Sequence, residues 1–559
     1  MRTYLIDSIN RTVVFEFDYD EEIIQDIKNS DYNSRFNPEL KHWVIPVNDW
    51  SKEKIKYIVS KYNFSPAEKK EEKDVVVDYS IKGIDLAYIK GMCDSRGFSY
   101  TPRDYQLEAL GYALKNGNII NGDDVGLGKT FEAIIYAEVT NSFPCLVVTP
   151  ASVKYNWSEK WAEIVGPHRK ISVIETETAK RKNDWSAEVV IINYDIIGKK
   201  QGRGATVKFP ELLSTEWKMQ IYDEAHFLKE KKAQRSKAAK MITKPDNTII
   251  QLLTGTATMS KPVELWNLLL LIKSEQNIAE DWYQFVRRYC GGYVGKFGWV
   301  TDGATNILEL NQKLRDTCYI RREKKDVLKE LPDVITEVIK VPITNKRAIT
   351  KAETNLIEYL TETKGIEAAE SAQEAEHLVQ IGVLRKLSIE GKVKAIESYL
   401  KDWKQSNEKL VVFGLHRTQL DYLSEKFKCP LIAGGVSSKQ KQKIVKDWQV
   451  SKDQFLFANI ESAGTGVDGL QNVCSNMIIT ELPWRPSDLW QVIGRLHRSG
   501  QLFTSNVKYL LSDYTIDMQM WQMLQAKEEV ITAVNKGMDI KKSGSGMREV
   551  MKLLRKKKK

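Results

Sequence analysis

The sequence predicts an α/β protein with two parallel-sheet lobes and helical insertions, preceded by a small α+β domain. Short β-branched strands alternate with longer helical stretches, this pattern occurs twice along the chain, and the first 75 residues follow a different one. At 559 residues the chain is also longer than one compact domain needs. We therefore expect a small α+β module, a first lobe, a second lobe with a closing helix, and a basic tail, at residues 1–75, 76–335, 336–540 and 541–559.

The α+β module is indicated by strand-like and helix-like segments in alternation. Strand candidates lie at Val13–Phe17 and Trp43–Pro46, and helix candidates at Glu21–Asn29 and Lys52–Tyr62. A polar stretch rich in lysine and glutamate, Ser65–Asp74, follows them and is typical of a linker. We expect the module to end near residue 75.

The two lobes are indicated by apolar strand candidates bounded by polar residues. In the first lobe they are Asn118–Asn121, Cys145–Thr149, Val189–Asn193, Met219–Tyr222 and Ile249–Leu253. In the second lobe they are Leu410–Phe413, Phe455–Asn459, Met477–Thr480 and Val507–Leu511. Between the two sets, residues 266–388 show no strong strand signal, so we expect a mostly helical region there.

Composition excludes several classes of protein. Hydrophobic residues make up 42% and charged residues 28%, and no apolar run approaches the roughly 20 residues that a membrane span requires. The segment Met1–Asn10 lacks the features of a secretory signal, so we expect an intracellular protein. The six cysteines are scattered without a CxxC pair, which argues against a disulfide framework and a zinc site.

The net charge of +10 does not by itself indicate a nucleic-acid-binding protein. The last 19 residues, Lys541–Lys559, hold nine lysines and arginines against one glutamate, so the rest of the chain is nearly neutral. Such a tail adds salt-sensitive affinity for phosphate backbones without making a specific site.

A glycine-rich loop between a strand candidate and a helix candidate predicts phosphate binding. Its residues are Asp123, Asp124, Val125, Gly126, Leu127, Gly128, Lys129 and Thr130. Glycines allow backbone N–H groups to surround anionic oxygens, the Lys129 ammonium can neutralise the β and γ phosphates, and the Thr130 hydroxyl can hold Mg²⁺. The usual pattern asks for glycine at the position of Asp123, so the loop alone could also be an incidental turn.

Two adjacent carboxylates strengthen this prediction. Asp223 and Glu224 follow the apolar strand candidate Met219–Tyr222, about ninety residues after the loop. We expect Asp223 to complete the Mg²⁺ shell with Thr130, and Glu224 to orient or deprotonate the attacking water. Loop and carboxylates together predict a site that hydrolyses ATP with Mg²⁺.

A third motif, Gln491–Gln501, places Arg495 and Arg498 three residues apart on one helix face of the second lobe. Arginines supplied by a second domain can stabilise the transferring phosphoryl group when the lobes close, which couples hydrolysis to motion. An exposed surface helix with two arginines is the alternative reading of this motif in isolation.

Taken in order, these blocks resemble the helicase motifs of superfamily two, and their sequences are similar to those of the Swi/Snf family. The resemblance runs from about Arg103 to Gln501 and implies two RecA-like lobes with ATP between them. The Asp-Asp-Val-Gly-Leu-Gly-Lys-Thr loop resembles the family's acidic variant, which accounts for Asp123. Arg321-Arg322 with Lys325-Asp326-Val327, and Gly391-Lys392 before a helix, are further signatures of this branch.

The resemblance also implies roles for single residues. Arg103 and Gln106 would lie at the adenine, and Gly466, Asp468 and Gln491 at the nucleotide. Contacts to nucleic acid are implied for Ser152, Trp157, Asn193 and Thr465, and coupling of the ATP state to the DNA grip for His226, Thr254, Gly255 and Thr256. The family usually has proline at Ala257, which makes the coupling detail less certain.

Within the family, Glu481–Pro486 is closer to the SMARCAL-type annealing helicases, and the segment Leu40–Pro46 resembles part of their HARP domain. An unrelated small α+β domain is the alternative for that module. The resemblance implies a monomeric translocase on double-stranded DNA, forked or branched, that remodels forks or anneals strands. Two alternatives stay open: a strand-separating helicase on single strands or RNA, for which we identify no aromatic or hairpin separation element, and a nucleotide-gated binding protein with negligible turnover.

Overall fold

The computed structural model describes residues 2–7, 12–30, 34–37, 42–47, 51–66, 84–175, 183–201, 204–255, 261–295, 298–301, 303–355, 376–464, 467–513 and 515–536. The basic tail, most of the expected linker and the site residues Thr256, Thr465 and Gly466 lie outside them. The chain separates into two compact units, Met1–Asp78 and Tyr79–Lys559, and each is described by itself.

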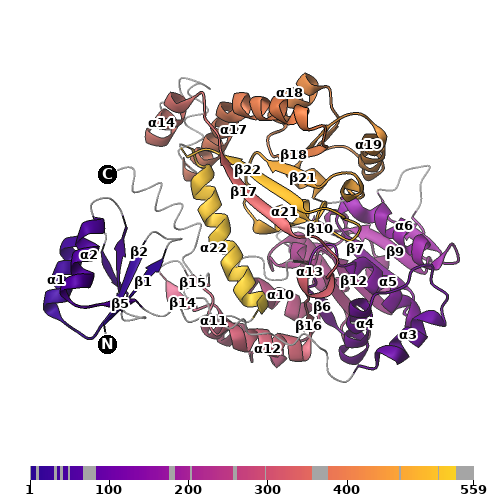
Figure 1. Cartoon of the computed structure of the whole chain (residues 1–559). Helices are drawn as coiled ribbons and strands as arrows, with labels where there is room; N and C mark the ends of the chain where they lie inside the picture. The colour runs from indigo at the N-terminus through magenta and orange to yellow at the C-terminus, as the bar shows by residue number, and fades with distance from the viewer. Residues whose placement is uncertain are drawn as a thin grey trace. The chain divides into compact units, whose positions relative to one another are not determined.

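The first unit is a five-stranded sheet with two helices (Figure 1). The strand order is β3-β4-β2-β1-β5. Its elements are β1 (Thr3–Asp7), β2 (Thr12–Glu16), α1 (Glu21–Ser30), β3 (Arg35–Asn37), β4 (His42–Pro46), α2 (Ser51–Lys61) and β5 (Ser65–Pro66). Alternate strand residues such as Val13, Phe15 and Ile45 pack against Ile23 and Ile27 of α1, because successive side chains of a strand point to opposite faces.

The second unit contains two parallel sheets, which confirms the predicted fold class. The first sheet has the order β16-β6-β13-β12-β7-β9-β8. Its strands are β6 (Ile119–Asn121), β7 (Cys145–Thr149), β8 (Ile171–Val173), β9 (Val189–Asn193), β12 (Met219–Asp223), β13 (Ile249–Leu253) and β16 (Tyr319–Ile320). The second sheet has the order β17-β22-β21-β18-β20-β19. Its strands are β17 (Val334–Lys340), β18 (Leu410–Gly414), β19 (Leu431–Ile432), β20 (Phe455–Asn459), β21 (Asn476–Ile479) and β22 (Ser505–Leu511).

Helices cover both faces of each sheet, so the central strands are continuous apolar runs. In the first sheet Val147 and Ile191 face one apolar core while Val148 and Ile192 face another. The helices of the first lobe are α3 (Leu86–Asp94), α4 (Asp104–Asn116), α5 (Lys129–Val139), α6 (Lys154–Val165), α7 (Tyr194–Ile197), α8 (Glu211–Ser214), α9 (Gln234–Ile242), α10 (Val263–Leu271), α11 (Trp282–Tyr289), α12 (Ile307–Thr317) and α13 (Lys324–Val327). Those of the second are α14 (Lys346–Thr354), α17 (Glu376–Trp403), α18 (Arg417–Phe427), α19 (Ser438–Val450), α20 (Ile460–Ala463), α21 (Pro486–Ile493) and α22 (Asp517–Lys536).

The predicted strands of both lobes are present, with bounds changed by two residues at most. The expectation of a mostly helical region at residues 266–388 is wrong in part. It also contains the hairpin β14 (Tyr293–Gly295) and β15 (Gly298–Val300), the edge strand β16 of the first sheet and the edge strand β17 of the second. Strands of two or three residues leave no readable period, and β17 is an edge strand with little buried surface.

Two further expectations differ from the structure. The expected lobe boundary after residue 335 falls inside β17, because this strand pairs along its whole length with β22 of the second sheet. Gly391-Lys392 lies within α17 and does not precede a helix. The buried Lys392 ammonium donates to Asp517 at 2.6 Å and to the backbone oxygens of Thr480 and Leu510, and so fixes α17 to the second sheet.

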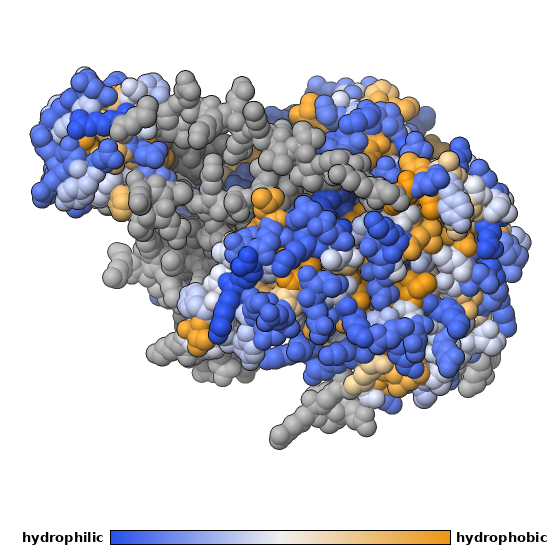
Figure 2. Space-filling view, turned by 90° about the horizontal axis from the view of Figure 1, so that it is seen from below, coloured by the Kyte–Doolittle hydropathy of each residue, from blue (hydrophilic) through white to orange (hydrophobic). Residues whose placement is uncertain are grey.

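The surface shown in Figure 2 is mostly hydrophilic, with apolar residues scattered in small groups. Among the described helices, none combines the length and the apolar character needed to cross a membrane.

Candidate active site

The phosphate loop runs between β6 and α5 and has the backbone of an anion cradle. Gly126 and Gly128 have φ of 92° and 91°, a left-handed region that favours glycine. The loop ends at the N-terminus of α5, where free N–H groups and the helix dipole favour an anion. The Lys129 ammonium donates to the backbone oxygens of Asp123 at 2.5 Å and Asp124 at 3.1 Å, so its charge is held within the loop.

Asp123 anchors this loop to the lobe. It is fully buried, and its carboxylate accepts hydrogen bonds from the backbone N–H of Arg322 at 2.8 Å and from the Arg322 guanidinium. Arg322 also contacts Glu132 of α5 and the backbone oxygen of Tyr105. The acidic residue therefore stands where other loops have glycine because it pairs with a buried arginine that follows β16.

Asp223 and Glu224 lie at the carboxyl end of β12, beside the loop. The Asp223 carboxylate accepts from Trp157 Nε1 at 2.7 Å and from the Thr149 hydroxyl at 3.1 Å, which fixes its orientation. Burial, and then the charge of Glu224, raise the pKa of Asp223 to about 6. For Glu224 burial acts in the same direction, but the hydrogen bond from His226 and the charges of His226, Lys129 and Arg495 outweigh it and lower its pKa. The pair thus holds negative charge that a cation would stabilise.

His226 connects Glu224 to the segment that follows β13. Its Nδ1 lies 3.1 Å from Glu224 Oε2 and 3.3 Å from the Thr254 hydroxyl. The backbone N–H of Thr254 donates to Asn121 at the end of β6. A Cβ on the neighbouring Gly255 would lie 2.8 Å from the side chain of Val125, so only glycine fits against the phosphate loop. This geometry agrees with the coupling role that the resemblance implies.

The second lobe contributes residues of α21 and of the turn after it. Arg495 and Arg498 lie in this turn, so the expectation that one helix face carries both arginines is wrong, because α21 ends at Ile493. The Gln491 amide donates to Glu224 at 3.3 Å, across the two lobes. The Arg495 guanidinium donates to the backbone oxygens of Val467 and Gly464, while its Nε is buried without a hydrogen-bond partner among the described residues. Burial, and then the neighbouring Arg498, lower the pKa of Arg495 to about 10.

Further contacts between the lobes lie beside the loop. The Lys324 ammonium, from the end of the first sheet, donates to the backbone oxygen of His497 at 2.7 Å. Arg103 donates to the Ser499 hydroxyl at 2.9 Å. Within the second lobe, Arg498 pairs with Asp468 at 2.9 Å. The lobes are therefore in contact around the phosphate loop, where arginines of the second lobe can reach a triphosphate.

A pocket of about 480 Å³ lies beside Arg103, in the segment expected at the adenine, and is lined by Arg103, Asp104, Tyr105, Glu108 and Val327. Gln106 itself is buried, with its oxygen accepting from Tyr100 and Arg103 and its nitrogen donating to Leu127. The Gln106 side chain therefore holds Leu127 of the phosphate loop in place. Its role at the base stays a prediction.

The residues expected at nucleic acid are only partly accessible. Trp157 is 1% exposed and its indole N–H binds Asp223, so a direct contact with nucleic acid does not fit its burial. Asn193 is 5% exposed and donates to Asp195. Ser152 is half-buried. Trp157 and Asn193 are better described as supports of the carboxyl ends of β7, β9 and β12.

Sequence reasoning missed Arg322, Lys324 and Thr149 as parts of this site. Arg322 and Lys324 belong to a basic cluster noted only as a family signature, after a strand too short to recognise. Had β16 been identified, the position of these residues after the carboxyl end of a parallel strand would have indicated the site. Thr149 ends β7 and could have been found by the same rule.

Comparisons with known proteins agree with this geometry. The SNF2-related domain family matches residues 50–389, and the helicase conserved C-terminal domain family matches residues 391–500. The SWI/SNF-related matrix-associated actin-dependent regulator of chromatin subfamily A-like protein 1 of Xenopus tropicalis is 30% identical over 82% of this chain and 47% of that protein. DNA annealing helicase and endonuclease ZRANB3 of Homo sapiens is 30% identical over 76% of this chain and 40% of that protein.

The chain spans about half the length, or less, of these curated relatives. A solved Sulfolobus solfataricus SWI2/SNF2 ATPase core in complex with dsDNA aligns with a TM-score of 0.37 at 21% identity, over 82% of this chain and 97% of that one. The family matches together cover most of the chain and confirm the predicted resemblance. The chain therefore belongs to the SNF2-related family and carries its helicase C-terminal domain.

Proposed function

We propose that the chain is a translocase on double-stranded DNA, driven by ATP and Mg²⁺, that remodels forks or anneals strands. The observation that carries this proposal is the contact of Gln491 with Glu224 beside the phosphate loop, with Arg495 and Arg498 on the same segment. Hydrolysis at such a site requires both lobes, so each turnover moves one lobe against the other.

The residues of the site divide the work of phosphoryl transfer. Lys129 and the N-terminus of α5 bind the phosphates, Glu224 orients the attacking water and takes its proton, and Arg495 and Arg498 stabilise the charge that develops on the transferred group. Thr130 and Asp223 fit Mg²⁺, because a hydroxyl and a carboxylate are the oxygen ligands that this ion takes. A cation would also stabilise the charged form of Asp223, whose pKa is raised. The ion would neutralise phosphate charge when bound.

The annealing and fork role rests on the relatives. The name of the human relative describes it as a DNA annealing helicase, and this chain matches 40% of its length. We propose that the first unit, whose β4 contains the HARP-like His42–Pro46, directs the motor to forked or branched DNA. Removing residues 1–73 should then spare duplex-stimulated hydrolysis and reduce the preference for forks.

The test is steady-state ATP hydrolysis at one low salt concentration without nucleic acid and with linear duplex, forked DNA, single-stranded DNA or RNA. Strong stimulation by duplex or fork is the expected result, and Lys129→Ala should abolish it while the protein stays folded. Stimulation by single strands or RNA alone would favour the strand-separating helicase. Nucleotide-dependent DNA binding without turnover would favour the nucleotide-gated binding protein.

A further inference from the structure

A cluster of aromatic side chains with one arginine lies on the first lobe, where α11 meets the β14–β15 hairpin. We call Tyr283, Arg287 and Trp299 the aromatic hairpin site, because Tyr283 and Arg287 both lie against the Trp299 ring. The active site described above does not use these residues. The sequence alone did not reveal the aromatic hairpin site, because the hairpin strands have only three residues each.

Two tryptophans give the site a rigid base. Trp282 and Trp299 pack on the apolar core of the first lobe, with ring centroids 5.8 Å apart and nearly perpendicular planes. Tyr283 lies 5.6 Å from Trp299, measured between ring centroids, and is 52% exposed. A tyrosine exposed beside anchored tryptophans presents ring surface to solvent at a low entropic cost, because its side chain has few rotatable bonds.

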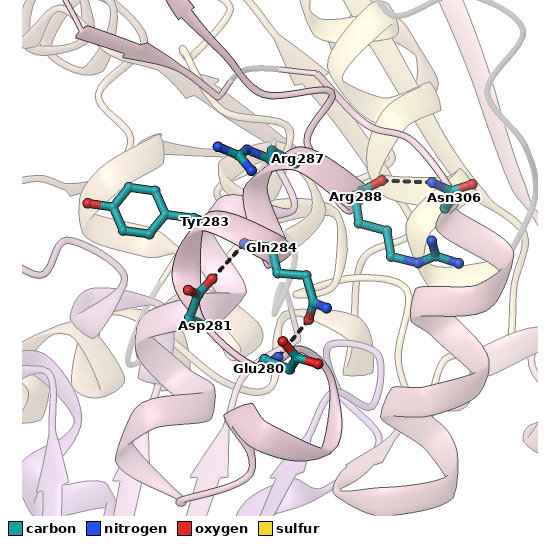
Figure 3. A pocket seen from close by; sticks show the side chains of 7 residues that line it. All are labelled: Glu280, Asp281, Tyr283, Gln284, Arg287, Arg288 and Asn306. Carbon is teal, nitrogen blue, oxygen red and sulfur yellow. Dashed lines mark hydrogen bonds between the residues drawn. The ribbon is translucent and has the colours of Figure 1, made fainter.

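A polar pocket of about 580 Å³ adjoins Tyr283 and Arg287 (Figure 3). It is lined by Glu280, Asp281, Tyr283, Gln284, Arg287, Arg288 and Asn306. Tyr283 and Arg287 are one helical turn apart on α11, and the Arg287 guanidinium lies 5.4 Å from the centre of the Trp299 ring. The volume is in the range of small-ligand sites and suits one planar group of nucleobase size.

The charges of the pocket mostly cancel. Asp281 accepts from the backbone N–H of Gln284 and caps α11, and Arg288 pairs with Glu309. Glu280 and Arg287 are the other two charged residues of the lining. Among the described residues, no carboxylate lies within ion-pair distance of Arg287. The exposed ring surface suits stacking on a base, because every base has a π face.

We infer that the aromatic hairpin site binds unpaired nucleobases of a strand that leaves the duplex. A base stacks on Tyr283, and the Arg287 guanidinium lies beside it over the Trp299 ring. Gln284 and Asn306 supply amide groups at the pocket for the base edges, in a sequence-tolerant manner. The inference rests on the proposed function, since unpaired bases are present where a motor on DNA meets a fork.

The experiment uses the full chain and a forked DNA with 2-aminopurine in one unpaired arm. Stacking on an aromatic ring quenches the fluorescence of this base analogue, so the wild-type chain should quench it on binding. Tyr283→Leu keeps apolar bulk and removes the π face, and we expect it to weaken binding of the arm about fivefold or more, the equivalent of roughly 1 kcal/mol per stacked base. Tyr283→Phe should retain the quenching.

Tyr88→Ala serves as the matched control, because Tyr88 is a 66% exposed tyrosine elsewhere on the first lobe. Duplex-stimulated ATP hydrolysis should be unchanged in Tyr283→Leu. Equal quenching by wild type and Tyr283→Leu, with duplex stimulation intact, would overturn the base site and leave the translocase standing. Quenching that depends on Tyr283, in a protein that duplex does not stimulate, would support the base site and overturn the translocase.

Discussion

The amide nitrogen of Gln491 in the second lobe lies 3.3 Å from the Glu224 carboxylate in the first. Glu224 also touches His226, which reaches the Thr254 hydroxyl after β13. The carboxylate expected to activate water is therefore held from both lobes. We therefore propose that its position depends on lobe closure and that closure responds to the nucleotide.

Gln491→Glu should reduce ATP turnover more than Gln491→Ala. Alanine removes one hydrogen bond to a charged group, about 1.5–3 kcal/mol, whereas glutamate also places a like charge against Glu224 and opposes closure. We expect steady-state turnover at saturating DNA to fall at least about tenfold in Gln491→Ala and further in Gln491→Glu. Gln522→Glu on the exposed side of α22 is the charge-matched control. Equal turnover in the two Gln491 variants would argue against closure through this contact.

Alanine substitutions of the two arginines should both reduce turnover but should differ in their effect on the free energy of unfolding. Arg495 is half-buried, with a buried Nε, and donates to the backbone oxygens of Gly464 and Val467, so Arg495→Ala should lose both turnover and roughly 1–3 kcal/mol of unfolding free energy. Arg498 is partly exposed and pairs with Asp468, so Arg498→Ala should lose turnover, about 10³-fold, with little change in stability. Thermal unfolding and ATP hydrolysis measured on both variants check this. A stable, active Arg498→Ala protein would contradict the arginine-finger role.

Much of the site could be predicted because its chemistry follows local patterns. Lys129 and Asp223 each follow an apolar strand, and the carboxyl ends of parallel strands meet at one edge of a sheet. Arg322 could not be placed in this way, because its partner Asp123 is 199 residues away and β16 consists of two residues. Trp157 was misplaced for a similar reason: its indole binds a carboxylate on a strand that the sequence does not connect to it.

Metal binding should depend on pH through Asp223. Its pKa is raised to about 6, so as pH falls through 6 the carboxyl takes up a proton and loses its affinity for a cation. Below pH 6, Mn²⁺ affinity measured by electron paramagnetic resonance should therefore fall by up to about tenfold for each pH unit. Asp223→Asn should bind weakly at every pH. A wild-type affinity that stays constant from pH 7 to pH 5 would exclude Asp223 as the ligand.

Lys324→Met should stabilise the protein and slow hydrolysis. Burial lowers the pKa of Lys324 to about 8, so the folded state binds this proton less tightly than the unfolded state. Above the ordinary pKa of 10.5 the side chain is uncharged in both states and costs no unfolding free energy. As pH falls from there through about 8, the unfolded state and then the folded state bind the proton, and free energy of unfolding is lost. At pH 7 we expect the free energy of unfolding of Lys324→Met to exceed that of the wild type by about 1–3 kcal/mol. This difference should decrease towards pH 10.

Turnover should nevertheless fall in Lys324→Met, because the variant loses a cation near Lys129 and the bond to His497 that joins the lobes. Lys232→Met, at an exposed position of the same lobe, is the control for removing a surface charge. Greater stability together with undiminished turnover would show that Lys324 has no part in closing the site.

Asp123→Gly restores the residue that most phosphate loops have at this position, and it should destabilise the protein. It removes the carboxylate that makes most of the hydrogen bonds to the buried Arg322 guanidinium and leaves Glu132 at 3.3 Å, so the cost should stay below the roughly 3–5 kcal/mol of a buried charge that loses its partner altogether. Asp123→Asn keeps the shape and loses the charge, so it should cost less than glycine. In the double variant with Arg322→Leu, which leaves no unpaired cation, we expect much of the lost unfolding free energy to return. A double-mutant cycle in urea measures this coupling, and additive effects would show that Asp123 does not act through Arg322.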